Sequence, residues 1–211
     1  MQLIFVRHGL PERQELDRGR ADPGLGPAGA AQAAALGDWL GREPIDAIAT
    51  SPARRARETA APLAERCRLT PVTVADLDEF DTGSASYVPV EEMRAAGDPR
   101  WELLSSGRLY GTDAEAQEFR GRVVAAVESL VRAYPGGNVA VVCHGGVINA
   151  YLGHLLGIDT PLWFAVRYTG ICRVLASRSG HRSLLTVNEV PHLPREGLRV
   201  GGTEPGAVTA P

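Results

Sequence analysis

Two histidines, each at the end of a short apolar run and directly before a glycine, are the residues that point most clearly to chemistry. His8 follows the apolar residues 3–6 and the cation Arg7, and His144 follows the apolar residues 139–143. Runs of this length are typical of buried strands, and ligands in open α/β sheets bind outside the carboxyl ends of the strands. Imidazole is a competent nucleophile, and a neighbouring guanidinium suits phosphate. The pair therefore indicates a phosphate-ester site at one edge of a sheet.

Glycines after the second histidine favour the close approach of an anion to the backbone. Gly145 and Gly146 follow His144, and residues 147–156 have the composition of a helix. A glycine-rich turn lets the main chain come near a phosphate, and the first N–H groups of a helix point at it. We expect Gly145 to belong to the phosphate-binding surface.

A basic segment lies between the two histidine motifs. Residues 49–60 follow an expected strand and contain Pro52, which is typical of a first helical turn, together with Arg54, Arg55 and Arg57. Side chains at these positions leave a helix in different directions, so we expect one of the three guanidiniums to face the site. The residues alone leave open which one it is.

Taken together, these motifs resemble the histidine phosphatase superfamily, also called phosphoglycerate mutase-like. The resemblance depends on the Arg-His-Gly opening, the Ser-Pro-x-x-Arg-Ala-x-x-Thr-Ala segment, a glutamate four residues before a glycine, and a late strand that ends in His-Gly. It covers the chain from the first strand to about His192. Four motifs in this order are far more specific than any one of them alone.

The resemblance implies a role for five residues. His8 matches the nucleophile, Arg7 and Arg55 match the phosphate-binding arginines, Glu79 matches the proton donor, and His144 matches the second histidine of the phosphate pocket. Such a site hydrolyses phosphomonoesters through a phosphohistidine, and the scheme requires no metal and no cofactor. Two nearby guanidiniums would keep the His8 imidazole neutral and able to attack.

Three assignments have alternatives. In a second branch of the superfamily an aspartate follows the second histidine, but here Gly145 has that position, which favours Glu79 and branch 1. Glu79 also lies in an acidic cluster, for which a solvated loop is the ordinary interpretation. The first loop lacks the asparagine that touches phosphate in many members, and Gln14 is a candidate replacement. Either Arg54 or Arg57 could take the role given to Arg55.

Two other functions compete with hydrolysis. One is phosphoryl transfer of the phosphoglycerate mutase type, which the short distance in sequence between Glu79 and His144 and the unusual first loop disfavour. The other is a non-catalytic member that binds a phosphorylated ligand or serves as a dimerisation scaffold, which the full set of matching residues disfavours. We expect a small phosphorylated substrate, with a homodimer as one possible assembly.

Composition narrows the class of protein. The chain has 211 residues, a net charge of −3 and 44% hydrophobic residues, as is ordinary for one soluble globular domain. This charge argues against a broad surface for nucleic acid or anionic membranes. No apolar run approaches the roughly 20 residues that span a bilayer, and no secretory signal is visible. Three scattered cysteines predict no disulfide framework, and a cytoplasmic location follows.

Alternating strands and helices predict a three-layer α/β/α sandwich with a mostly parallel central sheet. We expect one domain over residues 1–190, with an insert at about 84–111, and an irregular tail over residues 191–211. Strands are expected at 45–49, 72–75, 138–143, 171–177 and 183–188, and helices at 27–40, 52–66, 90–96, 113–133 and 147–156.

Overall fold

The computed structural model describes residues 1–80, 83–105 and 111–194. A six-stranded sheet forms its centre, built from β1 (Gln2–Arg7), β3 (Ala47–Thr50), β4 (Val72–Thr73), β6 (Asn138–Cys143), β7 (Ile171–Ala176) and β8 (Arg182–Glu189). Their order across the sheet is β4-β3-β6-β1-β7-β8. The first four strands of this order are parallel, and β7 and β8 are antiparallel to their neighbours. The prediction of a mostly parallel sheet is therefore confirmed.

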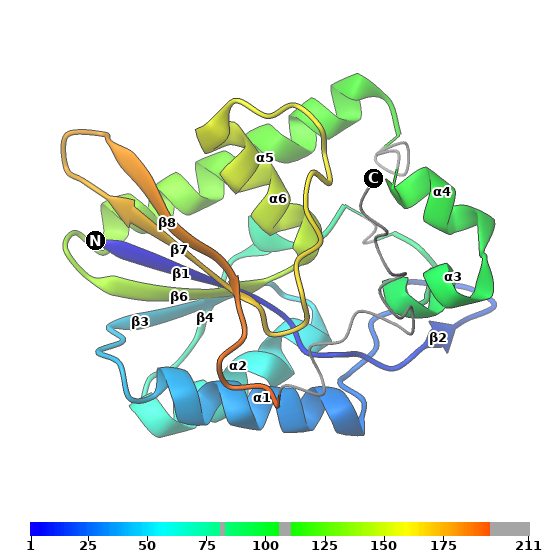
Figure 1. Cartoon of the computed structure of the whole chain (residues 1–211), viewed down its shortest axis with the longest axis horizontal. Coiled ribbons are helices and arrows are strands. Elements are labelled where there is room, and N and C mark those ends of the chain that lie inside the picture. The colour runs from blue at the N-terminus through cyan, green and yellow to red at the C-terminus, as the bar shows by residue number, and fades with distance from the viewer. Residues whose placement is uncertain (81–82, 106–110, 195–211) are drawn as a thin grey trace, which may run out of the picture.

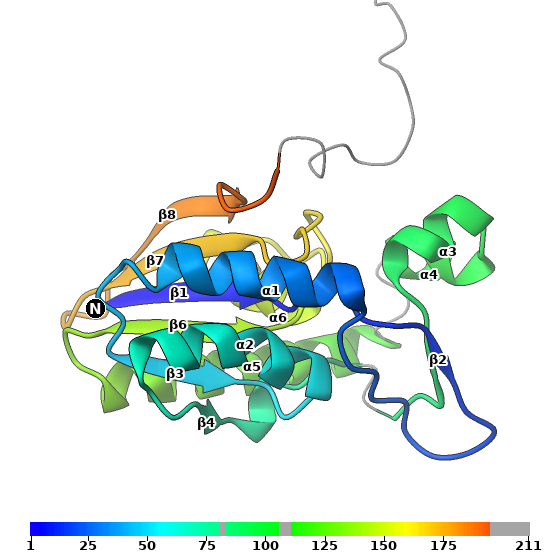
Figure 2. The ribbon, with the colours of Figure 1, turned by 90° about the horizontal axis from the view of Figure 1, so that it is seen from below.

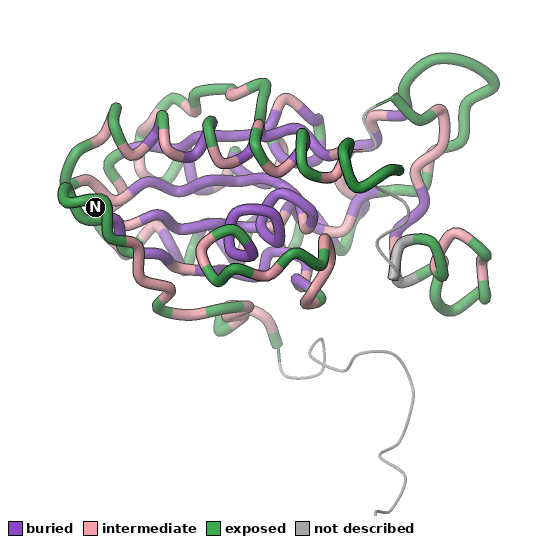
Figure 3. The backbone as a smooth tube through the Cα atoms, turned by 90° about the horizontal axis from the view of Figure 1, so that it is seen from above, coloured by how far each residue is buried: buried purple, intermediate pink, exposed green. Residues whose placement is uncertain are grey.

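Helices cover both faces of the sheet (Figures 1 and 2). On one face lie α1 (Pro27–Leu40) and α2 (Arg54–Cys67), and on the other lie α5 (Asp113–Ala133) and α6 (Gly145–Leu156). Strand β1 shows why two layers are needed, because Leu3 and Phe5 pack on the α5–α6 side while Ile4 and Val6 pack on the α1–α2 side. Burying each such side chain contributes about 1.5–3 kcal/mol. The three-layer sandwich is as predicted, and Figure 3 shows the buried strands between the helices.

Strand pairing brings the two histidine motifs to one edge of the sheet. β1 and β6 are parallel neighbours in a register that pairs Arg7 with Cys143. His8 and His144 therefore follow side by side, and the His8 backbone N–H donates to the Cys143 carbonyl at 2.9 Å. The next strand, β3, ends at Thr50 in the same direction. The carboxyl ends of three strands thus meet where the chemistry was expected.

A small lobe lies beyond this edge (Figure 1). It contains a two-stranded sheet of β2 (Gln14–Glu15) and β5 (Ser86–Tyr87), and the helices α3 (Val90–Ala96) and α4 (Pro99–Ser105). Of these, only α3 was predicted, and strands of two residues leave too little periodicity to detect. The lobe falls in the first loop and in the expected insert at 84–111, of which residues 106–110 lie outside the described residues.

Two helix starts differ from the predictions. The helix after Pro52 begins at Arg54, with the proline before it rather than in its first turn. The helix after His144 begins at Gly145 and not at residue 147, with His144 itself as N-cap. Glycine is a weak helix former, which favours a turn at these two residues, but the helix starts on them. The first helical N–H groups therefore lie directly beside the second histidine.

The cysteines, the turn before Glu79 and the C-terminal tail complete the description of the chain. All three cysteines are free thiols, with Cys143 and Cys172 buried as expected in strands. A 3₁₀ turn, η1 (Ala75–Leu77), precedes Glu79. Within the described ranges, no helix combines the length and the apolar character needed to cross a bilayer. Most of the predicted tail, residues 195–211, lies outside the described residues, so the domain boundary near 190 stays a prediction.

A close backbone crossing holds the loop that follows the nucleophile. The start of α1 passes so near this loop that a Cβ on Gly29 would lie 2.0 Å from the Leu10 carbonyl oxygen, and one on Gly9 would lie 2.7 Å from the Gly29 carbonyl oxygen. Both obstacles are backbone atoms, which cannot rotate away. Glycine at these two positions therefore fixes where the first loop leaves β1.

We predict that Gly29→Ala destabilises the protein although alanine favours helices. The clash forces a backbone shift, and overpacking of this kind costs about 1–3 kcal/mol or more, a decrease in Tm of several degrees. Gly121→Ala in α5 is the matched control, because a Cβ there meets no atom within 4 Å. We expect this control to keep or raise the Tm. Equal melting temperatures for both variants would contradict the crossing.

Candidate active site

His8 is buried at the end of β1 with its two ring nitrogens in different environments. Only 2% of the residue is exposed. Its Nδ1 lies 2.8 Å from the Gly9 carbonyl oxygen, and its Nε2 accepts a hydrogen bond from Arg55 Nε at 3.3 Å. A carbonyl oxygen can only accept and a guanidinium can only donate. The neutral ring is therefore protonated on Nδ1, and its Nε2 carries the lone pair that can act as a nucleophile.

Arg55 bridges the two histidines from the first turn of α2. It is 3% exposed, and its second contact runs from a terminal nitrogen to His144 Nδ1 at 3.3 Å. Its guanidinium also lies over the Tyr87 ring, 4.6 Å from the centroid, and 3.9 Å from a carboxylate oxygen of Asp22. The long distance to Asp22 leaves the buried cation with mostly neutral partners. An anion at this place would compensate its charge.

Of the three arginines in the basic segment, only Arg55 is turned inward. Arg54 is exposed and forms an ion pair with Glu58 at 2.6 Å, one helical turn away. Arg57 is also exposed. The geometry thus brings together the histidines and the arginine that the family pattern selects.

His144 lies opposite His8, with the two ring centroids 5.1 Å apart. It has no exposed surface. Because Arg55 donates to Nδ1, the neutral ring carries its hydrogen on Nε2, which lies 2.7 Å from the Ser51 hydroxyl. The two histidines therefore have opposite tautomers, and each presents a lone pair to the same guanidinium.

Burial keeps both rings neutral at physiological pH. Loss of hydration lowers the pKa of His8 well below its ordinary value, and the charges of Arg55 and then Arg7 lower it further, while the Gly9 carbonyl raises it. The pKa of His144 is lowered for the same reasons, by burial first and by Arg55 next. The neutral His8 ring could therefore act as a nucleophile without first losing a proton.

Arg7 completes the positive side of the site. One terminal nitrogen donates to the Val166 carbonyl at 2.6 Å, and its guanidinium carbon stacks 3.8 Å from the centroid of the Tyr168 ring. Gly145 is its neighbour, since a Cβ built there would lie 3.8 Å from Arg7 Nε, an ordinary contact distance. The contacts to Val166 and Tyr168 orient the guanidinium before any ligand arrives.

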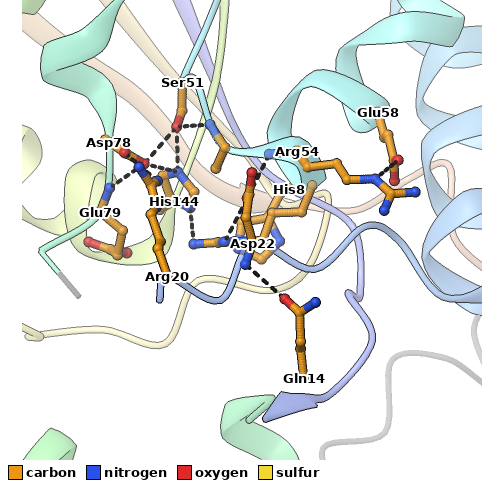
Figure 4. Close-up of polar contacts among 12 residues, drawn as sticks. His8, Gln14, Arg20, Asp22, Ser51, Arg54, Glu58, Asp78, Glu79 and His144 are labelled. Carbon is orange, nitrogen blue, oxygen red and sulfur yellow. Dashed lines mark hydrogen bonds and ion pairs between the residues drawn. The ribbon is translucent and has the colours of Figure 1, made fainter. Parts of the chain in front are cut away.

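Glu79 lies on the His144 side of the cluster (Figure 4). The residue is 9% exposed, and one carboxylate oxygen accepts from the Gly146 backbone N–H at 2.9 Å. The other accepts from Phe80 N–H at 3.2 Å. This carboxylate is therefore fixed at the start of α6 and does not belong to a solvated loop.

Gln14 is not brought into this cluster. It lies in β2, and its amide oxygen accepts from the Asp22 backbone N–H at 2.8 Å, so the side chain braces the first loop (Figure 4). Its contact with a phosphate stays a prediction. Two other arginines of the first loop are also occupied, Arg13 by Glu15 and Arg20 by Asp78.

Sequence reasoning missed several residues that contact the predicted ones. Ser51 and Asp78 lie behind His144, and Tyr87 and Tyr168 lie against the two arginines. Ser51 stands in the Ser-Pro motif and Asp78 directly precedes Glu79, so both lie in segments that the sequence motifs mark. Among the described residues, His, Cys, Asp and Glu side chains form no group of three that could hold a metal.

Comparison with known proteins identifies the relatives of this chain. The model of the histidine phosphatase superfamily (branch 1) matches residues 3–190. A protein named uncharacterized phosphatase PhoE, from Bacillus subtilis, is 31% identical over 162 residues, which are 76% of this chain and 80% of the relative. Phosphoserine phosphatase 1 from Hydrogenobacter thermophilus is 32% identical over 165 residues, covering 75% of this chain and 78% of the relative.

Solved structures have the same fold. A phosphoserine phosphatase from Entamoeba histolytica, in complex with 3-phosphoglyceric acid, has a TM-score of 0.71 at 24% identity and covers 92% of this chain and 99% of its own. A mycobacterial glucosyl-3-phosphoglycerate phosphatase in complex with VO3 has a TM-score of 0.72 at 24% identity, covering 90% and 99%. Since the family model matches nearly the whole chain, the protein belongs to branch 1 of the histidine phosphatase superfamily.

Proposed function

We propose that this protein hydrolyses small phosphomonoesters through a phosphohistidine on His8. The observation that carries the proposal is one buried guanidinium, Arg55, in contact with the two neutral imidazoles of His8 and His144. A tetrahedral phosphoryl group placed between these side chains would meet a nucleophile on one side and donors around its oxygens. Phosphoryl transfer needs this combination of positioning and charge stabilisation.

The first half of the reaction makes the phosphoenzyme. His8 Nε2 attacks phosphorus while the ester P–O bond breaks, and Glu79 gives a proton to the leaving oxygen. Arg55 exchanges its long contact with Nε2 for the phosphoryl oxygens, and Arg7 binds the same oxygens. The Gly9 carbonyl holds Nδ1–H throughout, so the ring stays aligned for attack.

The second half returns the enzyme to its starting state. Glu79, now a carboxylate, takes a proton from a water molecule as that water attacks phosphorus, and the P–N bond to His8 breaks. The products are inorganic phosphate and a neutral imidazole. Neither half of the reaction oxidises or reduces any group.

The names of the relatives narrow the substrates to be tried first. Relatives and structural neighbours include phosphatases named for phosphoserine and for glucosyl-3-phosphoglycerate. Both of these compounds carry a phosphoester on a small organic acid or sugar acid. A probable phosphoglycerate mutase from Yersinia enterocolitica is also similar, at 27% identity, so mutase transfer stays the alternative. A homodimer and a cytoplasmic location stay predictions as well.

His8→Ala should abolish turnover of every phosphomonoester that the protein hydrolyses, because no nucleophile remains. The measurement is phosphate release from a panel that includes phosphoserine and 3-phosphoglycerate, together with mass spectrometry of the acid-labile phosphoenzyme. His154→Ala, which changes an exposed histidine of α6, is the matched control and should behave like wild type. Normal turnover by His8→Ala would disprove the mechanism. Isomerised phosphoglycerate without released phosphate would establish the mutase instead.

Arg55→Ala should lower kcat/KM by about 100-fold or more, since each charge-assisted hydrogen bond to phosphate is worth about 1.5–3 kcal/mol. Arg57→Ala removes an exposed arginine of the same helix and should change kcat/KM by less than about threefold. Steady-state kinetics and a melting curve for each variant check this. A larger loss for Arg57→Ala would transfer the phosphate-binding role away from Arg55.

Glu79→Gln should harm the first step most for esters with a poor leaving group. Glutamine keeps an oxygen for the Gly146 N–H but has no proton to give. We expect a loss of about 100-fold or more for an alkyl phosphate and a much smaller loss for 4-nitrophenyl phosphate, whose leaving oxygen needs no acid. Rapid-quench measurement of phosphoenzyme formation isolates this step. Equal losses for both esters would exclude Glu79 as the acid.

A further inference from the structure

Behind His144, on the side away from Arg55, a buried chain of polar groups leads to a carboxylate. His144 Nε2 lies 2.7 Å from Ser51 Oγ, and Ser51 Oγ lies 3.3 Å from a carboxylate oxygen of Asp78 (Figure 4). Ser51 and His144 have no exposed surface, and Asp78 is 8% exposed. Water therefore has little access to these three groups.

The direction of each hydrogen bond in this chain is fixed by its ends. Arg55 can only donate to His144 Nδ1, so the hydrogen of the neutral ring is on Nε2 and is donated to Ser51. The hydroxyl of Ser51 then donates to the Asp78 carboxylate, which can only accept when it is ionised. One consistent arrangement of hydrogens thus runs from the guanidinium to the carboxylate.

Asp78 is held in place from the far side by the first loop. Its second oxygen forms an ion pair with Arg20 at 2.6 Å, and its first oxygen also accepts from the Glu79 backbone N–H at 3.2 Å. The carboxylate is therefore anchored between the first loop and the segment that carries the proton donor. Its distance to His144 Nε2 is 3.8 Å, close enough for a strong charge interaction in a buried site.

We propose that Ser51 and Asp78 are positioning residues for His144, which fix its neutral tautomer in the free enzyme and supply the negative charge that lets Nδ1 bind a proton and donate it to a phosphoryl oxygen. This inference rests on the proposed function. Neutral His144 has only a lone pair on Nδ1, which would repel a phosphate oxygen. A protonated ring can donate from both nitrogens at once, to the phosphate and to Ser51.

The proton arrives with the substrate. A phosphomonoester monoanion transfers its remaining phosphate proton to His144 Nδ1, which leaves a dianion bonded to an imidazolium. Only the O–H bond breaks and only the N–H bond forms. Both negative charges of the dianion then interact with the guanidiniums of Arg7 and Arg55 before His8 attacks.

Charges around His144 oppose each other, and Asp78 is needed to balance them. Burial first, and then Arg55, His8, Arg7 and Arg20, lower the pKa of His144 and so disfavour the protonated ring. Arg55 lies on α2, Arg7 and His8 lie at the end of β1, and Arg20 lies on the first loop. The Asp78 carboxylate, 3.8 Å from His144 Nε2, is the group that favours a positive ring. Glu79 lies on the same segment, with its carboxylate on the Gly146 N–H.

The test is the pH dependence of kcat for Asp78→Asn. Since the complex is active with His144 protonated, kcat falls as the pH rises through the pKa of His144 in the complex. Removing the negative charge lowers that pKa, so the alkaline limb should move to lower pH, and kcat on the alkaline side should fall by about tenfold to a hundredfold. Asp76→Asn, which removes the same charge from an exposed neighbouring position, should leave the limb unmoved.

Two further variants separate a charge effect from a structural one. Ser51→Ala interrupts the chain and should shift the limb in the same direction as Asp78→Asn, whereas Ser51→Thr keeps a hydroxyl and should restore it. Arg20→Gln removes a positive charge from Asp78 and should shift the limb to higher pH. A merely structural role would lower the Tm or raise KM without these shifts of opposite sign. An unmoved limb in both Asp78→Asn and Arg20→Gln would overturn the inference.

A binding experiment keeps this inference apart from the proposed function. Nitrogen-15 NMR of His144 during titration with inorganic phosphate reads protonation without any turnover. We expect wild type to gain a proton on Nδ1 at saturation and Asp78→Asn to stay neutral at the same pH. A wild-type ring that stays neutral with phosphate bound would disprove the inference even in an active enzyme, whereas an inactive protein that shows the expected signals would contradict only the proposed hydrolysis.

Discussion

The constraint on which the site depends is a positive charge buried between two neutral bases. Arg55 is almost inaccessible to water, yet its contacts in the cluster are lone pairs of His8 and His144, an aromatic ring and a carboxylate at 3.9 Å. Burying a cation with so little compensation lowers the stability of the fold, and the packing of the core must offset this free energy. An anion of two charges would relieve it. The same constraint explains why the imidazoles stay neutral, because a second positive charge here would be costlier still.

The sheet makes this arrangement rigid. Parallel pairing of β1 with β6 and of β6 with β3 aligns the residues that follow each strand, so His8, His144 and Ser51 are placed by backbone hydrogen bonds rather than by their own side chains. The helix that follows β3 then turns Arg55 back over them. Sites built on such elements hold their geometry better than sites on loops. The small lobe of β2, β5, α3 and α4 is built from shorter elements, and it touches the cluster through Tyr87 of β5, whose ring lies against Arg55.

The sequence could predict the parts of the site that local patterns encode. Helix α5 has the predicted bounds. Two apolar runs, each leading to a histidine, were enough to predict that His8 and His144 lie at one edge of the sheet. The choice of Arg55 came from family resemblance, since three arginines on one helix cannot be distinguished without knowing its rotation about the sheet. Contacts through space were out of reach. The local sequence of Asp78 does not indicate that this residue reaches His144 through Ser51. The sequence around Gln14 likewise does not indicate that its side chain binds the backbone of Asp22.

The two histidines show how one residue type acquires two tasks through the atom behind the ring. His8 Nδ1 donates to a backbone carbonyl, which carries no charge and favours a ring that stays neutral and attacks through Nε2. His144 Nε2 donates to a hydroxyl that leads to a carboxylate, and this arrangement can stabilise a positive ring. Burial is nearly the same for both, so burial alone would give them the same behaviour. What differs is the acceptor, and in the proposed mechanism this difference suits His8 to form a bond to phosphorus and His144 to donate hydrogen bonds to the phosphoryl oxygens.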